Sequence, residues 1–244
     1  KKINGFKEWL EVTRFLFKEP VVLVLSLLKS GLAVAGGIMT LIPLMASQVL
    51  SKPTMLSLGI GILYSARGLG AALGPLLVKR LFGETSTVLH WSIAASFFLK
   101  AGSYLFIANS ENLWTLSFGV AAATLFGSII WVFSSALIHL STPDRYLGRV
   151  FSFELAVMTL VMGISNWGVG FAVDGLGLTF NQVALWMAAL VILPGLFWTG
   201  FLTFVRKKLQ QGDCVGSICP IDPSGFNPLP LVHEGQIEKK VQEK

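Results

Sequence analysis

The stretch STPDRYLGRVFSFELAVMTLVMGISNWGVGFAVD, residues 141–174, joins a cluster of charges to a long apolar run. The charges lie near its start, at Asp144, Arg145, Arg149 and Glu154. An α-helix needs roughly 20 apolar residues to cross the ~30 Å hydrocarbon core of a bilayer, and the rest of this stretch is long enough to do so. The pattern predicts a membrane-spanning helix that begins at a charged membrane face.

Five further runs of the same kind make the chain an integral membrane protein. Of its 244 residues, 53% are hydrophobic and only 13% are charged, and its mean hydropathy is +0.69. Soluble domains carry about 25% charged residues. We therefore expect an all-α bundle of six transmembrane helices. The expected spans are residues 20–49, 55–78, 86–108, 113–140, 148–173 and 182–205.

The basic residues indicate the orientation of these spans. Lysines and arginines cluster before the first span and after the second, fourth and sixth, whereas the intervening loops hold only Lys52. Because cytoplasmic loops carry an excess of Lys and Arg, both termini are expected in the cytoplasm. The net charge of +6 does not suggest binding to nucleic acid, since the basic residues lie at span ends rather than on one surface stripe.

Two polar regions flank the bundle of residues 20–205. Residues 1–19 alternate apolar and charged positions near helical spacing, which predicts an amphipathic linker helix on the cytoplasmic membrane surface. Residues 206–244 are rich in Gly, Pro and charge, which predicts a mostly disordered cytoplasmic tail. Cys214, Cys219 and His233 lie in this tail, but their spacing fits no zinc pattern, so we expect no metal site.

The sequence contains no motif typical of an enzyme. H-E-x-x-H, G-x-S-x-G and GxxxxGK[ST] are all missing, so neither catalysis nor a cofactor is expected. The run ARGLGAALGP, residues 66–75, contains glycines but does not follow a strand. Small residues inside a span let another helix approach closely, so we interpret Gly68, Gly70 and Gly74 as helix-packing residues.

Ionisable side chains inside the spans are the strongest candidates for function. Each costs several kcal/mol in lipid unless it faces a partner or a wet cavity. Arg67 is expected near the membrane midplane, at ~18 Å depth, in a cavity or an ion pair. Lys29 lies inside the first span, and Glu154 is expected to point toward Lys29 or Arg67. We predict that these three residues line a substrate or coupling cavity. For Lys100 a cavity and a lipid-facing position both stay open.

Three segments resemble the C-terminal half of bacterial major facilitator superfamily transporters, in particular the branch of drug and siderophore exporters. They are LIPLMASQVL, residues 41–50, YSARGLGAALGPLLVKRL, residues 64–81, and the opening stretch. The resemblance covers about residues 5–208. It implies that the six spans correspond to helices seven to twelve of a transporter whose halves rock around a central site. It further implies a small-molecule substrate, proton antiport, a partner N-terminal half that this sequence lacks, and a place in the bacterial inner membrane.

The same resemblance gives the charged start of residues 141–174 a role as a cytoplasmic gate. Family members are thought to close the cytoplasmic side by docking an acid of the N-terminal half at this helix start. Thr142 is expected to cap the helix, Asp144 to lie in its first turn, and Arg149 to attract the incoming carboxylate. For Arg145, a role in setting topology is equally consistent with the pattern.

Two functions follow from these observations. The first is the C-terminal half of a proton-coupled exporter that works by alternating access. The second is a transport-inactive membrane module, truncated or split, that binds a partner bundle as a scaffold or regulator.

Overall fold

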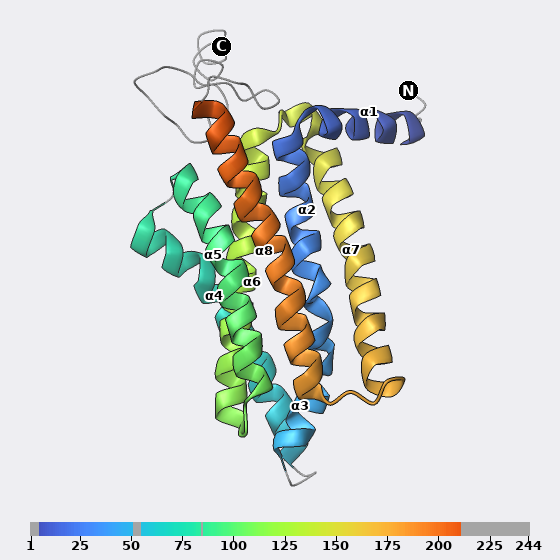
Figure 1. Cartoon of the computed structure of the whole chain (residues 1–244), viewed down its shortest axis with the longest axis vertical. Helices are drawn as coiled ribbons and strands as arrows, with labels where there is room; N and C mark the ends of the chain where they lie inside the picture. Colours follow the sequence, from blue (N-terminus) through green and yellow to red (C-terminus); the bar gives the residue numbers. More distant parts are fainter. Residues whose placement is uncertain (1–4, 51–54, 84, 211–244) are drawn as a thin grey trace.

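The described residues of the computed structural model, 5–50, 55–83 and 85–210, form helices joined by short connections (Figure 1). The elements are α1 (Gly5–Lys18), α2 (Pro20–Val34), the 3₁₀ helix η1 (Gly36–Leu41), α3 (Ile42–Val49), α4 (Leu56–Phe82), α5 (Ser86–Ala108), α6 (Leu113–Ser141), α7 (Asp144–Asp174) and α8 (Phe180–Gln210). Most of the predicted disordered tail, residues 211–244, lies outside the described residues.

Six helical segments in this described part are long and apolar enough to cross a membrane, as the sequence predicts. They are Pro20–Val49, Leu56–Phe82, Thr87–Ala108, Leu113–Ser141, Asp144–Asp174 and Phe180–Lys208. The first combines α2, η1 and α3. Several helices extend past the predicted spans because charged residues at a membrane face continue the helix; Lys79 and Arg80, for example, form the last turn of α4. The protein is a helical, multi-pass membrane protein.

The helices pack in an order that leaves two of them at the edges. α2 and α6 lie side by side in the middle, α5 packs on α6, and α8 packs on α5 and α2. α4 packs along α6 and touches α3, whereas α7 packs on α2 and η1 at the other side of the bundle (Figure 1). α4 and α7 are consequently the spans with some of the largest exposed faces.

Local sequence signals define where these helices begin and end. Asn112 caps α6 by accepting hydrogen bonds from the backbone N–H groups of Trp114 and Thr115. Gly83 ends α4 at a φ of 80°, in the left-handed region that glycine adopts at little cost. Such caps satisfy backbone groups that a helix end leaves without partners, so they favour short, well-defined connections.

Helix α1 lies crosswise to the long helices at one end of the bundle (Figure 1). Val12 and Leu16, about one turn apart, are buried, while Arg14 and Phe17 are exposed. Phe15 stacks on Tyr146 of α7 with ring centroids 4.5 Å apart. A helix therefore occupies most of the predicted linker region and rests on the start of α7; its cytoplasmic location stays a prediction.

The predicted helix-packing glycines divide into two groups. A Cβ atom at Gly70 would meet the Ala121 carbonyl group of α6, and one at Gly74 would meet the Leu125 carbonyl group. These two glycines allow the close approach of α4 to α6. Gly68 makes no such contact among the described residues, since a Cβ there would meet no atom within 4 Å, and its role in helix packing stays a prediction. Gly68 lies two residues before Gly70, about 200° around the helix, and so faces away from α6.

Candidate functional site

An ion pair between α2 and α7 lies inside the bundle. Lys29 Nζ is 3.0 Å from Glu154 Oε2, and both side chains are buried. At 1.5 Å per residue, each residue lies roughly 15 Å along its helix from the first turn, well within the membrane-crossing length. Of the two directions expected for Glu154, the structure has the one toward Lys29.

The Lys29 ammonium is held by two aromatic rings and a hydroxyl group as well as by Glu154. Lys29 Nζ donates to Ser135 Oγ at 2.7 Å, and lies 4.7 Å from the ring centroid of Trp131 and 5.6 Å from that of Phe151. Cations within about 6 Å of an aromatic face are attracted by the ring quadrupole. We name Trp131, Ser135, Phe151 and Glu154 the ammonium cage; α6 supplies the first two and α7 the others.

Hydrogen bonding in the cage is unequal between the cation and the anion. An ammonium has three N–H donors, and Lys29 directs two of them to oxygen atoms while lying over the Trp131 ring. Glu154 Oε1, in contrast, is buried and has no hydrogen-bond partner in the described part of the chain. A buried acceptor without a partner costs about 1–3 kcal/mol, and more when it is charged. The cage therefore has acceptor capacity that Lys29 does not use.

A second polar contact between the first span and α7 lies where that span is broken. Ser165 Oγ donates to the Val34 carbonyl at 2.7 Å and accepts from the Gly37 N–H at 3.1 Å. Tyr104 of α5 donates to the Ala35 carbonyl at 2.9 Å. Inside a membrane, the backbone groups freed by a helix break need such partners. The break is therefore sealed by side chains of α5 and α7.

Glycine is required at this break because the backbones approach closely. A Cβ atom at Gly37 would lie 2.7 Å from the Ser165 carbonyl oxygen. Any larger residue would push α7 away from η1, so Gly37 lets α7 dock.

Arg67 is not brought to the Lys29–Glu154 pair. It lies on α4 and is partly exposed. Lys100 is buried; its Nζ donates to the Ala123 carbonyl at 3.0 Å and lies 5.0 Å from the Tyr104 ring centroid. Of the three predicted cavity residues, Lys29 and Glu154 therefore form a close pair, whereas Arg67 lies on α4.

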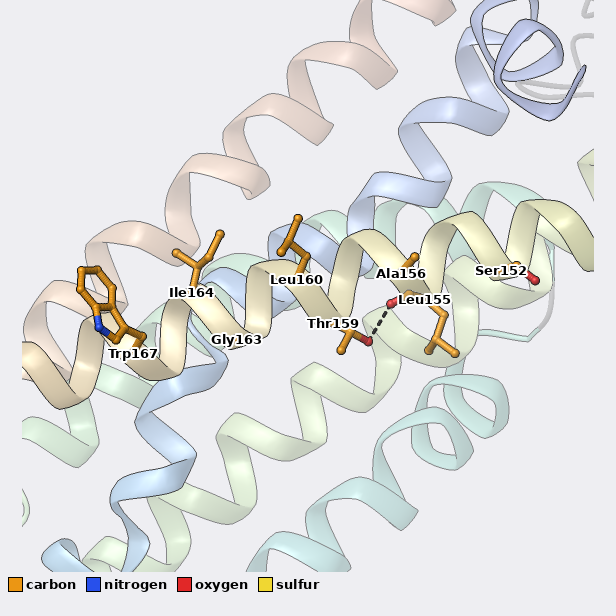
Figure 2. Close-up of a pocket in the computed structure, with 8 residues that line it drawn as sticks. All are labelled: Ser152, Leu155, Ala156, Thr159, Leu160, Gly163, Ile164 and Trp167. Carbon is orange, nitrogen blue, oxygen red and sulfur yellow. Dashed lines mark hydrogen bonds between the residues drawn. The ribbon is translucent and has the colours of Figure 1, made fainter. Parts of the chain in front are cut away.

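The outer face of α7 forms a broad, open hollow of about 840 Å³ (Figure 2). All its lining residues come from this one helix: Ser152, Leu155, Ala156, Thr159, Leu160, Gly163, Ile164 and Trp167. Thr159 Oγ1 bonds to the Leu155 carbonyl of the same helix, so the face is largely apolar. Glu154 and Ser165 face α2 and η1 on the opposite side, and α7 thus carries a polar inner stripe and an apolar outer one.

The connection between α6 and α7 corrects the prediction for Thr142. Pro143, not Thr142, precedes the first residue of α7, and no side chain caps this helix. Thr142 Oγ1 is buried without a hydrogen-bond partner among the described residues. The reason is the short connection: Thr142 and Pro143 are both extended, so the Thr142 hydroxyl lies one residue too early to reach the free N–H groups.

The other residues of the predicted gate lie near the start of α7. Asp144 is the first residue of the helix and is exposed, as expected for an acid in a first turn. Arg149 is half-buried, whereas Arg145 is exposed with its guanidinium 5.4 Å from the Tyr146 ring centroid. The two arginines therefore differ in environment, while the gating role itself stays a prediction.

Five residues around the Lys29–Glu154 pair and the helix break were not predicted from the sequence: Tyr104, Trp131, Ser135, Phe151 and Ser165. A partial signal exists for some of them. Ser135 follows Trp131 by one helical turn, and Glu154 follows Phe151 by three residues, so each pair lies on one helix face. That these two faces meet around Lys29 depends on the packing of both helices on α2.

Comparison with known proteins finds no matching family model, no similar curated protein and no similar solved structure. Within the described residues, no three His, Cys, Asp or Glu side chains are placed to hold a metal ion.

Proposed function

We propose that this chain forms one six-helix half of a secondary active membrane transporter. In this proposal it works with a second six-helix bundle, the N-terminal half, and moves a small molecule by alternating access. The finer proposal is proton-coupled export, which the resemblance of the three sequence segments suggests.

The observation that carries this proposal is the buried Lys29–Glu154 ion pair. Charges inside a membrane-spanning helix are costly, and well-packed apolar residues in place of a buried ion pair are often neutral or even stabilising. A pair placed inside two spans is therefore better explained by a function in which its charges change partners than by stability. Transport by alternating access is such a function, since the contacts of the site differ between its states.

The uncovered faces of α4 and α7 support a second bundle. Both spans leave much of their surface without contacts to the rest of the chain. The face of α7 contains the small residues Ser152, Ala156 and Gly163, and Gly68 of α4 is open. Small residues favour close helix packing in membranes. A bundle that covers both edges would enclose a cavity in front of α2 and α6.

The proposed location is the bacterial inner membrane, which the resemblance implies, and the proposed orientation has both ends in the cytoplasm, which the alternating basic loops suggest. Ser110 follows α5, on the expected outer side, and Ser141 ends α6, on the expected cytoplasmic side. A cysteine at Ser141 should react with a membrane-impermeant thiol reagent added from the cytoplasmic side, and a cysteine at Ser110 should not. Labelling of Ser110→Cys from the cytoplasm would contradict this orientation.

Vesicles that contain the protein together with its second bundle test transport. Ethidium serves as a cationic fluorescent probe and fluorescein as an anionic one, and acridine orange reports coupled proton movement. We expect Glu154→Gln to abolish probe flux while membrane insertion stays normal. Asp174→Asn is the matched control, since Asp174 is an exposed acid at the end of the same helix, and it should leave flux unchanged. Full flux in Glu154→Gln would contradict the proposal, and assembly with the second bundle without any flux would favour the scaffold function.

A further inference from the structure

The ammonium cage is a complete recognition site that the chain fills with one of its own side chains. Lys29 supplies the cation, and Glu154, Ser135, Trp131 and Phe151 surround it with a carboxylate, a hydroxyl and two ring faces. We infer that this cage binds the cationic head of an organic ligand, a primary ammonium or a guanidinium, which displaces the Lys29 ammonium. Binding of this cation does not depend on the proposed function. The further statement that the bound cation is the transported substrate rests on it.

The chemistry of the cage selects a cation that carries N–H donors. Carboxylate and hydroxyl oxygens accept hydrogen bonds, and the faces of the two rings attract positive charge. An anionic ligand would meet the Glu154 carboxylate and would have to compete with it for the Lys29 donors, two of which already bond to oxygen atoms.

The unused acceptor explains how a ligand can compete with Lys29. Of the two carboxylate oxygens of Glu154, Lys29 bonds to Oε2, and Oε1 has no partner in the described part of the chain. A guanidinium can bond to both carboxylate oxygens at once and also stack on an aromatic face. A ligand ammonium is free to approach between the two oxygens, whereas the Lys29 ammonium is limited by its tether to α2. The ligand thus gains a contact that Lys29 lacks.

Two walls of the cage are open to the surface of the chain. Trp131 is 41% exposed, and Phe151 and Ser135 are partly exposed. Lys29 and Glu154 lie behind these walls and are buried. The partly exposed side chains of Trp131, Ser135 and Phe151 are therefore the ones that a ligand would pass on its way to Glu154.

Lys100 offers a matched comparison within the same bundle. It too is a buried lysine that lies over one aromatic ring, 5.0 Å from the Tyr104 centroid. Its oxygen partner is the neutral Ala123 carbonyl rather than a carboxylate. The space left by removing Lys100 should consequently have little affinity for a cation.

Chemical rescue tests the cage directly and needs no transport. Lys29→Ala removes three carbons and the ammonium, the atoms of propylammonium, and leaves Glu154 without its counter-ion. In lipid nanodiscs, we expect Lys29→Ala to lower the thermal unfolding midpoint by roughly 10 °C. Millimolar propylammonium should restore at least half of this loss. Propan-1-ol, which lacks charge, and tetramethylammonium, which lacks N–H donors, should not.

Two further variants identify the source of the rescue. The double variant Lys29→Ala/Glu154→Gln should not respond to propylammonium, because the carboxylate is gone. Lys100→Ala should not respond either. The inference is overturned if Lys29→Ala is not rescued, or if propan-1-ol or the double variant gives the same rescue, since the amine would then only fill space.

The unmodified protein gives a second measurement that does not depend on the folding of a variant. Butylguanidinium does not react with amine-acylating reagents, so it can be added during acylation. Displacement of Lys29 should raise its acylation rate several-fold and leave that of Lys100 unchanged, as read by peptide mass spectrometry. Equal rates with and without the ligand would overturn the exchange. Rescue and exchange without flux of any cationic probe would contradict the transport proposal, whereas flux without rescue would contradict the cage.

Discussion

The contact between α4 and α6 allows a sharp test, because one added methyl group should disturb it. α4 packs mainly along α6, and Gly70 lies directly against the Ala121 carbonyl group of α6. A Cβ at this position would be 2.7 Å from Thr124 Oγ1 and still closer to the Ala121 carbonyl oxygen. Non-bonded heavy atoms prefer about 3.5 Å, so Gly70→Ala requires a displacement of roughly 1 Å between the two helices.

The size of the effect follows from what can move. A gap of 0.5–1 Å already loses about a quarter to a half of the dispersion energy of each contact. The Ala121 carbonyl group belongs to the helix backbone and cannot rotate away, so the neighbouring contacts must stretch. Overpacking typically costs about 1–3 kcal/mol, and we expect Gly70→Ala in the upper part of this range. The unfolding midpoint should fall by roughly 4–12 °C, on the scale of about 2–4 °C per kcal/mol for a chain of this size.

Gly68→Ala is the matched control, since it adds the same methyl group to the same helix. A Cβ there meets no atom within 4 Å, so Gly68→Ala should not lower the free energy of unfolding of the isolated chain, and the better helix propensity of Ala should raise it by up to about 1 kcal/mol. Differential scanning fluorimetry of both variants in nanodiscs makes the comparison. An equal or larger loss in Gly68→Ala would refute the packing argument, because the effect would then depend on the glycine type rather than on the α6 contact.

Three further outcomes are expected from the polar contacts of α7. Lys29→Met and Glu154→Gln should each lower the free energy of unfolding by about 3–5 kcal/mol, whereas the double replacement Lys29→Met/Glu154→Leu should recover most of it, which a double-mutant cycle measures. Ser165→Ala removes the hydroxyl that joins both sides of the helix break and should cost about 1–3 kcal/mol in the same unfolding assay; no loss would mean that the break needs no clamp. Arg149→Ala should raise cytoplasmic-side cysteine labelling and lower turnover, whereas Arg145→Ala, at an exposed position, should do little. If the two variants behave alike, both arginines only determine the orientation of the spans.

The fold class could be read from the sequence because its signal is local. Length and apolar composition alone determine whether a helix can cross a membrane, and all six spans were found in this way. Helix ends were less accurate because polar residues such as Lys79 and Arg80 continue a helix beyond its apolar part. The prediction that Thr142 caps α7 was wrong for a related reason. A cap depends on the backbone angles of two residues, and residue type alone does not determine these angles.

Of the residues in the candidate site, only the two charged ones, Lys29 and Glu154, could be predicted from the sequence. Lys29 and Glu154 were notable from sequence alone because a buried charge needs an explanation, and their contact was one of two alternatives. Trp131 and Phe151 carried no comparable signal, since aromatic residues are common in spans and most serve packing. Their role depends on which helix faces meet, and that is set by the docking of α6 and α7 on α2.

The arrangement of α7 connects the cage to the rest of the bundle. α7 lies at an edge, and its polar contacts to the first span are at Glu154 and at Ser165, about 16 Å apart along the helix. Loss of the Lys29 contact would leave the Ser165 contact and the apolar packing on α2 and η1 in place, so α7 would stay docked at the helix break. Nearer its start, α7 would lose its ion pair and keep contacts such as the stacking of Tyr146 on Phe15 of α1. In the proposed transporter, ligand exchange in the cage would therefore tilt α7 about the helix break rather than detach it. The end that loses the ion pair is the one that carries Arg149, so a change in the contact of α7 with the second bundle is expected there.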